Sequence, residues 1–226
     1  MSSDSGDRLN DRQAKLPEPI DVAVFDLGGV LVDWNPRYLY RQLFDDDEAM
    51  EHFLGEICSP AWNERQDAGR PWTEAIAELV ARHPDQAPMI AAYHQRWPEM
   101  LRGEISDSVS VVKELKAQGL RLYALTNWSH ETFPVARRLF AFLDCFDGIV
   151  VSGEEKLIKP DVSIFHRLLT RYAVSPSRAV YIDDSPRNVT VAAELGFHAL
   201  RFIDSHRLRQ DLQALGLSVE SAEPPR

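Results

Sequence analysis

The sequence has few cysteines and no long apolar run. Its two cysteines, Cys58 and Cys145, lie far apart and lack the close spacing of a zinc site or a redox pair. This scarcity argues against a disulfide-stapled secreted fold and fits a reducing cytoplasm. No segment approaches the roughly 20 consecutive apolar residues of a membrane span, and the polar start of the chain lacks a signal-peptide core. We therefore expect a cytoplasmic protein with no membrane partner.

Positive charge is also scarce. The 226 residues include 25 Lys and Arg against 35 Asp and Glu, which gives a net charge of -10. Such an excess of negative charge disfavours nucleic acids and anionic membranes as partners. An anionic ligand must therefore be attracted by locally placed positive groups. The length fits one catalytic domain that carries an insertion, and we expect a monomer or a homodimer.

Several short apolar runs are separated by segments with helical periodicity. Runs that are apolar throughout are typical of strands buried on both faces, as in a parallel sheet with crossover helices. The sequence therefore predicts an α/β fold, with a Rossmann-like parallel sheet flanked by helices. The predicted strands are residues 22–25, 122–125, 149–151, 179–182 and 197–202.

Polar side chains stand where these runs end. Asp26 follows the first run, Thr126 and Asn127 follow the second, and the pair Asp183 and Asp184 follows the fourth. Lys159 is reached from the loop after the third run. In parallel sheets the ligand crevice lies at the carboxyl ends of the strands. We therefore expect these side chains to converge on one crevice.

The residue types in this group indicate their chemistry. Three carboxylates in a partly desolvated crevice repel one another unless a cation neutralises them. Carboxylate oxygens without His or Cys at ligand spacing favour magnesium over zinc. Lys159 adds a fixed positive charge. A magnesium ion, a lysine and hydroxyl and amide donors together make a receptor for a dianionic phosphoryl group.

Four motifs in this order resemble those of the haloacid dehalogenase-like hydrolase superfamily. They are F-D-L-G-G-V-L, L-T-N-W-S, K-L-I-K-P-D and Y-I-D-D-S, and the resemblance spans about residues 21–216. It implies that Asp26 is a nucleophile that becomes an aspartyl phosphate. It also implies phosphate-binding roles for Thr126 and Asn127, and charge neutralisation by Lys159. Asp183 resembles the magnesium ligand, and Asp184 is the weaker candidate.

The sequence departs from the common phosphatase pattern at Gly28. Phosphatases of the superfamily carry a second aspartate there, which serves as general acid and base. Gly28 can still offer its backbone carbonyl to the metal. Asp33 or a metal-bound water are the candidates to replace the missing carboxyl. A branch with a similar D-L-G-N/G-V start acts on sugar phosphates such as glucose 1-phosphate, whose anomeric oxygen leaves readily, so we favour that substrate class.

The pattern between the first two predicted strands is helical. We predict a core of residues 20–33 and 104–216, an inserted α-helical cap at 34–103, and tails at 1–19 and 217–226. The predicted cap helices are 36–44, 47–57, 60–67, 72–82 and 86–101. The resemblance implies that the cap closes over the crevice and selects the leaving group. The candidates for this contact are Trp34, Asn35, Arg37, Trp62, Asn63, Arg65 and, outside the cap, Trp128.

These observations favour a magnesium-dependent phosphatase that acts on a small phosphorylated metabolite. The first alternative is a 2-haloacid dehalogenase, in which the same aspartate attacks carbon without a metal. That reading explains Gly28, but the dehalogenase pattern carries Ser and Asn where this chain has Asp183 and Asp184. The second alternative is a binding or regulatory protein with little turnover, and the intact Asp26 and Lys159 weigh against it.

Overall fold

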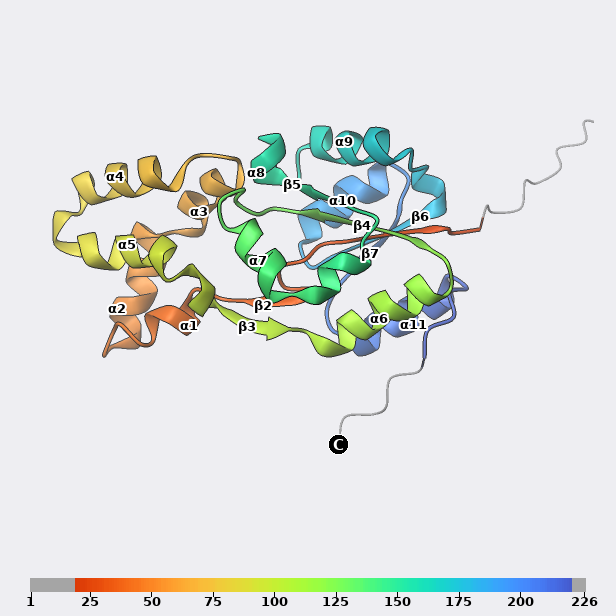
Figure 1. The fold of residues 1–226 in the computed structure, drawn as a ribbon, viewed down its shortest axis with the longest axis horizontal. Helices are drawn as coiled ribbons and strands as arrows, with labels where there is room; N and C mark the ends of the chain where they lie inside the picture. The colour runs from red at the N-terminus through yellow and green to blue at the C-terminus, as the bar shows by residue number, and fades with distance from the viewer. Residues whose placement is uncertain (1–18, 221–226) are drawn as a thin grey trace, which may run out of the picture.

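The computed structural model describes residues 19–220, which are built around a five-stranded parallel sheet (Figure 1). The strand order is β5-β4-β1-β6-β7, and every neighbouring pair is parallel. This confirms the predicted α/β fold. The strands are β1 (Val22–Phe25), β4 (Arg121–Thr126), β5 (Gly148–Val151), β6 (Ala179–Asp183) and β7 (His198–Arg201).

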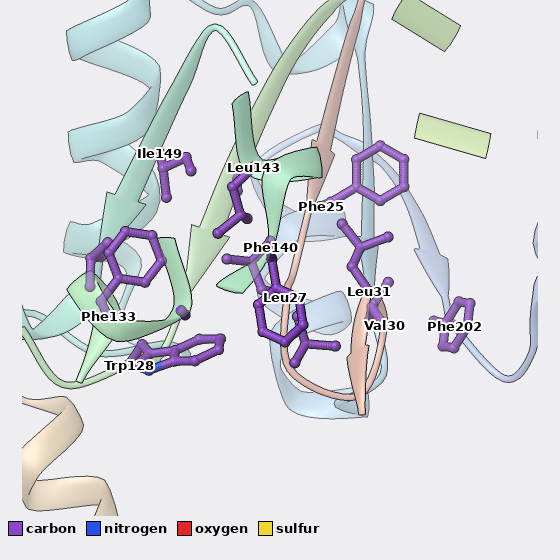
Figure 2. Packing of buried hydrophobic residues seen from close by; sticks show 14 of the residues in the cluster. Phe25, Leu27, Val30, Leu31, Trp128, Phe133, Phe140, Leu143, Ile149 and Phe202 are labelled. Carbon is purple, nitrogen blue, oxygen red and sulfur yellow. The ribbon is translucent and has the colours of Figure 1, made fainter. Parts of the chain in front are cut away.

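Alternate residues of the strands serve two hydrophobic layers, one on each face of the sheet. Ala23 and Phe25 of β1 face the layer formed with α6 (Ser106–Ala117), α7 (Phe133–Leu139) and α11 (Ser205–Ala214). Figure 2 shows Phe25, Leu27 and Leu31 in this layer. Val22 and Val24 face the layer formed with α9 (Val162–Tyr172) and α10 (Pro186–Glu194). Burial on both faces is why the strand sequences are continuously apolar.

A group of short helices lies between β1 and β4 in the chain and forms a separate lobe at one end of the molecule (Figure 1). A tight aromatic cluster holds the lobe together, with Trp62 and Tyr93 each packed 5.5 Å from Trp72 between ring centroids. The helices are α1 (Arg37–Tyr40), α2 (Asp47–His52), α3 (Pro60–Asp67), α4 (Trp72–Arg82) and α5 (Ala87–Gln95).

Two of the cap helices differ from their predicted lengths. The helix predicted at 36–44 is regular only over α1 and continues as turns. The helix predicted at 47–57 changes from α to π geometry after His52, and the π segment spans Phe53–Ile57. Sequence periodicity does not distinguish these tighter or wider turns from a regular helix.

The base of the cap contains two strands that the sequence analysis missed. β2 (Val32–Trp34) and β3 (Leu101–Glu104) pair antiparallel as a separate two-stranded sheet. The helix predicted at 86–101 was therefore wrong in its second half, because α5 ends at Gln95 and a 3₁₀ turn at Trp97–Met100 leads into β3. Both strands contain charged residues and are only partly buried, so they lack the continuous apolar run that marks the equally short core strands.

The chain ends differ in part from the predicted tails. Residues 1–18 and 221–226, most of both predicted tails, lie outside the described residues. Residues 217–220 do not behave as a tail, because Leu217 and Val219 are buried in the core and the Glu220 amide donates to Oε2 of Glu114 at 2.8 Å. No helix within residues 19–220 is both long enough and apolar enough to cross a membrane.

Candidate active site

The turn after β1 fixes the carboxylate of Asp26. The Asp26 amide donates to Ile182 O on β6 at 2.8 Å, so the sheet pairing continues up to this residue. The carbonyl of Leu27 then accepts from the amides of Leu31 and Val32 at 2.8 and 2.9 Å, which closes the turn. Oδ1 of Asp26 accepts from the Leu27 amide at 2.7 Å. The carboxylate therefore has a fixed position above the end of the central strand.

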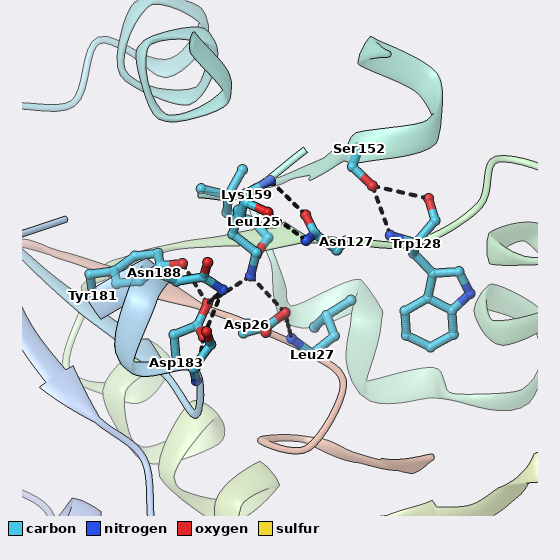
Figure 3. A network of polar contacts seen from close by, with 11 residues as sticks. Asp26, Leu27, Leu125, Asn127, Trp128, Ser152, Lys159, Tyr181, Asp183 and Asn188 are labelled. Atoms are coloured by element: carbon cyan, nitrogen blue, oxygen red, sulfur yellow. Dashed lines mark hydrogen bonds and ion pairs between the residues drawn. The ribbon is translucent and has the colours of Figure 1, made fainter. Parts of the chain in front are cut away.

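Lys159 lies buried between two of the acidic residues (Figure 3). Its Nζ is 3.0 Å from Oδ1 of Asp26 and 2.7 Å from Oδ2 of Asp183, and it donates to Leu125 O at 2.7 Å. Burial by itself would lower the pKa of Lys159, but the two carboxylates outweigh burial and raise the pKa above its ordinary value. Lys159 is therefore a fixed cation within the crevice.

Asp183 is fully buried, and its carboxylate is surrounded by hydrogen-bond donors (Figure 3). Oδ2 accepts from Lys159 Nζ at 2.7 Å, from Tyr181 Oη at 2.6 Å and from Asn188 Nδ2 at 3.0 Å. Oδ1 accepts from the Ser185 amide at 2.9 Å and again from Asn188 at 3.0 Å. Because a carboxylate offers about four lone-pair sites, Asp183 has little capacity left for a metal ion.

Asp184 is exposed and lies against the turn after β1. A Cβ atom added to Gly29 would lie 2.6 Å from Oδ2 of Asp184, so this carboxylate sits directly beside the Gly29 backbone. Oxygen atoms of Asp26, Asp183 and Asp184 lie within 4.8 Å of one another. The hydrogen bonds of Asp183 make Asp184 the better candidate for a direct metal ligand, whereas the family resemblance gives Asp183 that role.

The electrostatics of this cluster fit a bound cation. Burial raises the pKa of Asp26 to about 7, and the charges of Asp183 and Asp184 act in the same direction, against Lys159. Burial and the neighbouring Asp183 likewise raise the pKa of Asp184. A divalent cation reverses this tendency because it stabilises the ionised carboxylates. The donors are all hard oxygens, which suits magnesium.

Thr126 and Asn127 follow β4 beside this cluster. Oγ1 of Thr126 is buried and has no hydrogen-bond partner within residues 19–220, so it is available to an anion. The Asn127 amide instead clamps the backbone of Lys159: Oδ1 accepts from the Lys159 amide at 2.9 Å and Nδ2 donates to its carbonyl at 3.0 Å. Asn127 therefore positions Lys159 in addition to lining the crevice.

Two adjoining cavities lie between the core and the cap. The smaller is about 70 Å³ and borders Gly28, Trp97 and Trp128, and the larger is about 490 Å³ and borders Arg37, Tyr93 and Arg187. Four residues line both cavities, namely Trp34, Asn63, Asp67 and Asn127. The structure therefore brings part of the cap next to the crevice that holds the acidic cluster.

The cap candidates from the sequence fall into two groups. Trp34 and Asn63 line both cavities and Trp128 lines the smaller one. Three other candidates have structural partners: Arg37 borders the larger cavity but pairs with Glu51 at 2.6 Å, Asn35 Oδ1 accepts from the Arg37 amide, and Trp62 is buried in the aromatic cluster. Arg65 borders a further cavity, which Lys159 also lines.

Sequence reasoning missed two residues that the structure places at the site. Asn188 follows Asp183 by five residues, and the first turn of α10 brings its amide back to that carboxylate. The sequence predicted Asp67 only as the last residue of the helix at 60–67. Asp33 is the residue that the sequence offered as a replacement for the carboxyl missing at Gly28. Its carboxylate accepts from Tyr38 Oη at 2.9 and 3.0 Å, and it lines neither cavity.

Known proteins resemble this chain over most of its length. The sesquiterpene phosphatase astK of Aspergillus oryzae is 28% identical over 194 residues, 86% of this chain and 95% of that protein. A HAD-like hydrolase structure from Porphyromonas gingivalis superimposes with a TM-score of 0.70 at 22% identity, covering 89% of this chain and 100% of that one. A HAD family enzyme of Bacteroides thetaiotaomicron, solved with magnesium and inorganic phosphate, superimposes with a TM-score of 0.61 at 21% identity. The match covers 80% of this chain and 93% of that one.

The family profile described as haloacid dehalogenase-like hydrolase matches residues 20–196, which is most of the chain. The matched region begins just before β1 and ends just after α10, so it contains the whole acidic cluster, Lys159 and the cap. The fold, the order of the motifs and this match agree. The chain belongs to the haloacid dehalogenase-like hydrolases.

Proposed function

We propose that this protein is a magnesium-dependent phosphatase that hydrolyses a small phosphorylated metabolite through an aspartyl phosphate on Asp26. One observation carries the proposal: the Asp26 carboxylate is fixed between the Lys159 ammonium and two further carboxylates. A carboxylate attacks a phosphate dianion only when the charge repulsion between them is masked. Lys159 masks part of this charge, and a magnesium ion held by the carboxylates would mask more of it.

The residues of the site have separate roles in the reaction. Asp26 attacks phosphorus, its new bond to phosphorus forms as the bond to the leaving oxygen breaks, and water then cleaves the acyl phosphate. Lys159 stabilises the negative charge, Thr126 Oγ1 binds a phosphoryl oxygen, and Asn127 keeps Lys159 in place. Asp26, Asp184 and the Gly28 carbonyl would hold magnesium, with Asp183 beside them. The ion would neutralise phosphoryl charge.

The leaving group would occupy the cavities beneath the cap. Indole rings and side-chain amides line them, and such a lining suits a polar ring or chain that packs on an aromatic face. A sugar phosphate meets this description. The relative astK is named a sesquiterpene phosphatase, so the phosphate ester of an apolar alcohol is a second candidate substrate.

The test is phosphate release from a panel of glucose 1-phosphate, hexose 6-phosphates, glycerol phosphates and a sesquiterpenyl phosphate. We expect release with magnesium, none with chelator, and none from Asp26→Asn, with a phosphorylated Asp26 peptide trapped from the unmodified enzyme. The control is Asp85→Asn, which removes an exposed cap carboxylate outside the cavity linings. Chelator-insensitive chloride release from 2-chloropropionate would replace the proposal with dehalogenation, and binding without turnover would replace it with a regulatory role.

A further inference from the structure

Position 28 leaves an empty space beside the nucleophile. A Cβ atom added to Gly28 would meet no other atom within 4 Å, so neither close packing nor an unusual backbone angle requires glycine there. Gly28 also borders the smaller cavity. If the proposed phosphatase function holds, an alkoxide leaving group still needs a proton, and a general acid has to reach this space from elsewhere.

One carboxyl group of the cap reaches this space. Asp67, the last residue of α3, lines the smaller cavity together with Gly28 and also lines the larger one. Within residues 19–220 it is the acidic residue that borders the smaller cavity. Glu64, one turn earlier on α3, is exposed and lines the larger cavity and a further cavity beside Lys159, but it does not border the smaller cavity with Gly28. Asp67 is therefore the cap carboxyl that shares this cavity with Gly28.

The position of Asp67 is fixed by hydrogen bonds from both domains. Its Oδ2 accepts from Asn63 Nδ2 at 3.0 Å within α3. Its backbone carbonyl accepts from the Ser152 hydroxyl at 2.6 Å, and that hydroxyl accepts from the Trp128 amide at 2.8 Å in the core. A Cβ atom on Gly69 would lie 2.9 Å from Gly153 O, so the backbone after α3 passes close to the core. These contacts attach the cap to the core at Asp67 itself.

The surroundings of Asp67 keep it ready to carry a proton. Burial raises the pKa of Asp67 to about 7, the Ser129 amide opposes this, and the charges of Glu64 and Asp26 add to it. Tyr93 of α5 lines the larger cavity with Asp67, and burial and the Asp67 charge raise the pKa of Tyr93 well above the usual range, so Tyr93 stays neutral. A general acid works best when its pKa is near the working pH.

We infer that Asp67 is the general acid and base of this enzyme, supplied by the cap in place of the side chain absent at Gly28. As Asp26 forms its bond to phosphorus, the carboxyl proton of Asp67 passes to the leaving oxygen. Asp67 is then a carboxylate. It takes a proton from the water that attacks the aspartyl phosphate, and the carboxyl group and Asp26 are both regenerated.

The experiment compares two phosphate esters of different leaving groups. With Asp67→Asn and magnesium, kcat/KM for the best ester of a primary alcohol in the panel should fall by about 10² to 10⁴, the usual size of general acid catalysis. For p-nitrophenyl phosphate, which leaves as a stable phenolate, it should fall less than tenfold. Asp85→Asn should change neither value. Asp67→Ser gives the same comparison should the Asn variant fail to fold.

The outcomes separate this inference from the proposed function. An equal loss on both esters, or no loss on either, would overturn the role of Asp67 while leaving the phosphatase intact. A leaving-group-selective loss supports the role, because a merely structural residue would slow both esters alike. Absence of magnesium-dependent phosphate release by the unmodified protein would reject the phosphatase function itself.

Discussion

The Nζ atom of Lys159 lies 2.7 Å from Oδ2 of Asp183, and both side chains are almost completely buried. The same ammonium contacts Asp26 at 3.0 Å, so one cation serves two carboxylates. Removing one partner of a buried ion pair leaves an uncompensated charge, which is more costly than the loss of a surface pair. Asp183 therefore stabilises the carboxyl end of β6 and also orients Lys159.

Lys159→Met should lower the free energy of unfolding by about 3 to 5 kcal/mol, because Asp26 and Asp183 lose their buried counter-charge. Urea unfolding followed by circular dichroism measures this. The matched control is Lys116→Met, which breaks a half-exposed pair with Asp147 and should cost no more than about 1 kcal/mol. A loss of similar size in both variants would show that the buried pair contributes no special stability.

Gly29→Ala should destabilise the protein and disturb the acidic cluster. Gly29 has φ +74°, and its added Cβ would lie 2.6 Å from Oδ2 of Asp184. We expect a loss of about 1 to 3 kcal/mol in unfolding free energy and weaker magnesium binding. Gly28→Ala is the neighbouring control, since its Cβ meets open space, and it should change stability by about 0.5 kcal/mol or less. Thermal melting of the two variants side by side measures the difference. A larger loss of stability in Gly28→Ala than in Gly29→Ala would contradict the prediction.

Asp184→Asn should weaken magnesium binding at least about tenfold, a size typical of changes around a metal site. It should leave the metal-free melting temperature nearly unchanged, because Asp184 is exposed. Asp183→Asn should instead lower the metal-free melting temperature, because its carboxylate accepts hydrogen bonds from Lys159 and Asn188 inside the protein. Isothermal titration with magnesium and melting in chelator measure the two effects. If only Asp183→Asn loses the metal, the assignment based on hydrogen bonds is wrong.

Glu114→Gln should lower stability by about 2 kcal/mol at pH 7. Arg209 binds both oxygens of Glu114 at 2.7 and 2.8 Å, and this contact lowers the pKa of Glu114. A carboxyl group with a lowered pKa contributes stability above its unfolded pKa and loses that contribution as pH falls through its folded pKa. The difference in unfolding free energy between the unmodified protein and Glu114→Gln should therefore close below about pH 4. Urea midpoints from pH 3 to 8 test this, and a gap independent of pH would refute it.

The strands and the order of the polar residues after them could be read from the sequence. The runs from Val22 and Ala179 are apolar throughout because both faces of the sheet are covered, and this leaves a pattern that needs no tertiary knowledge. The convergence of Asp26 and Lys159 followed from the topology, because parallel strands place their carboxyl ends at one edge. The strands β2 and β3 could not be predicted, because they mix charged and apolar residues and leave no continuous apolar run.

The sequence by itself determined the sheet, the acidic cluster and the superfamily, since these depend on local apolar runs and on residues adjacent to them in the chain. Only the tertiary structure decided that the oxygen atoms of Asp183 are already hydrogen-bonded, because the donors come from separate loops and helices. It also decided that Asp67 borders the space at Gly28. The two residues are 39 positions apart in the chain, and the closure of the cap on the core, which no local pattern encodes, sets their proximity.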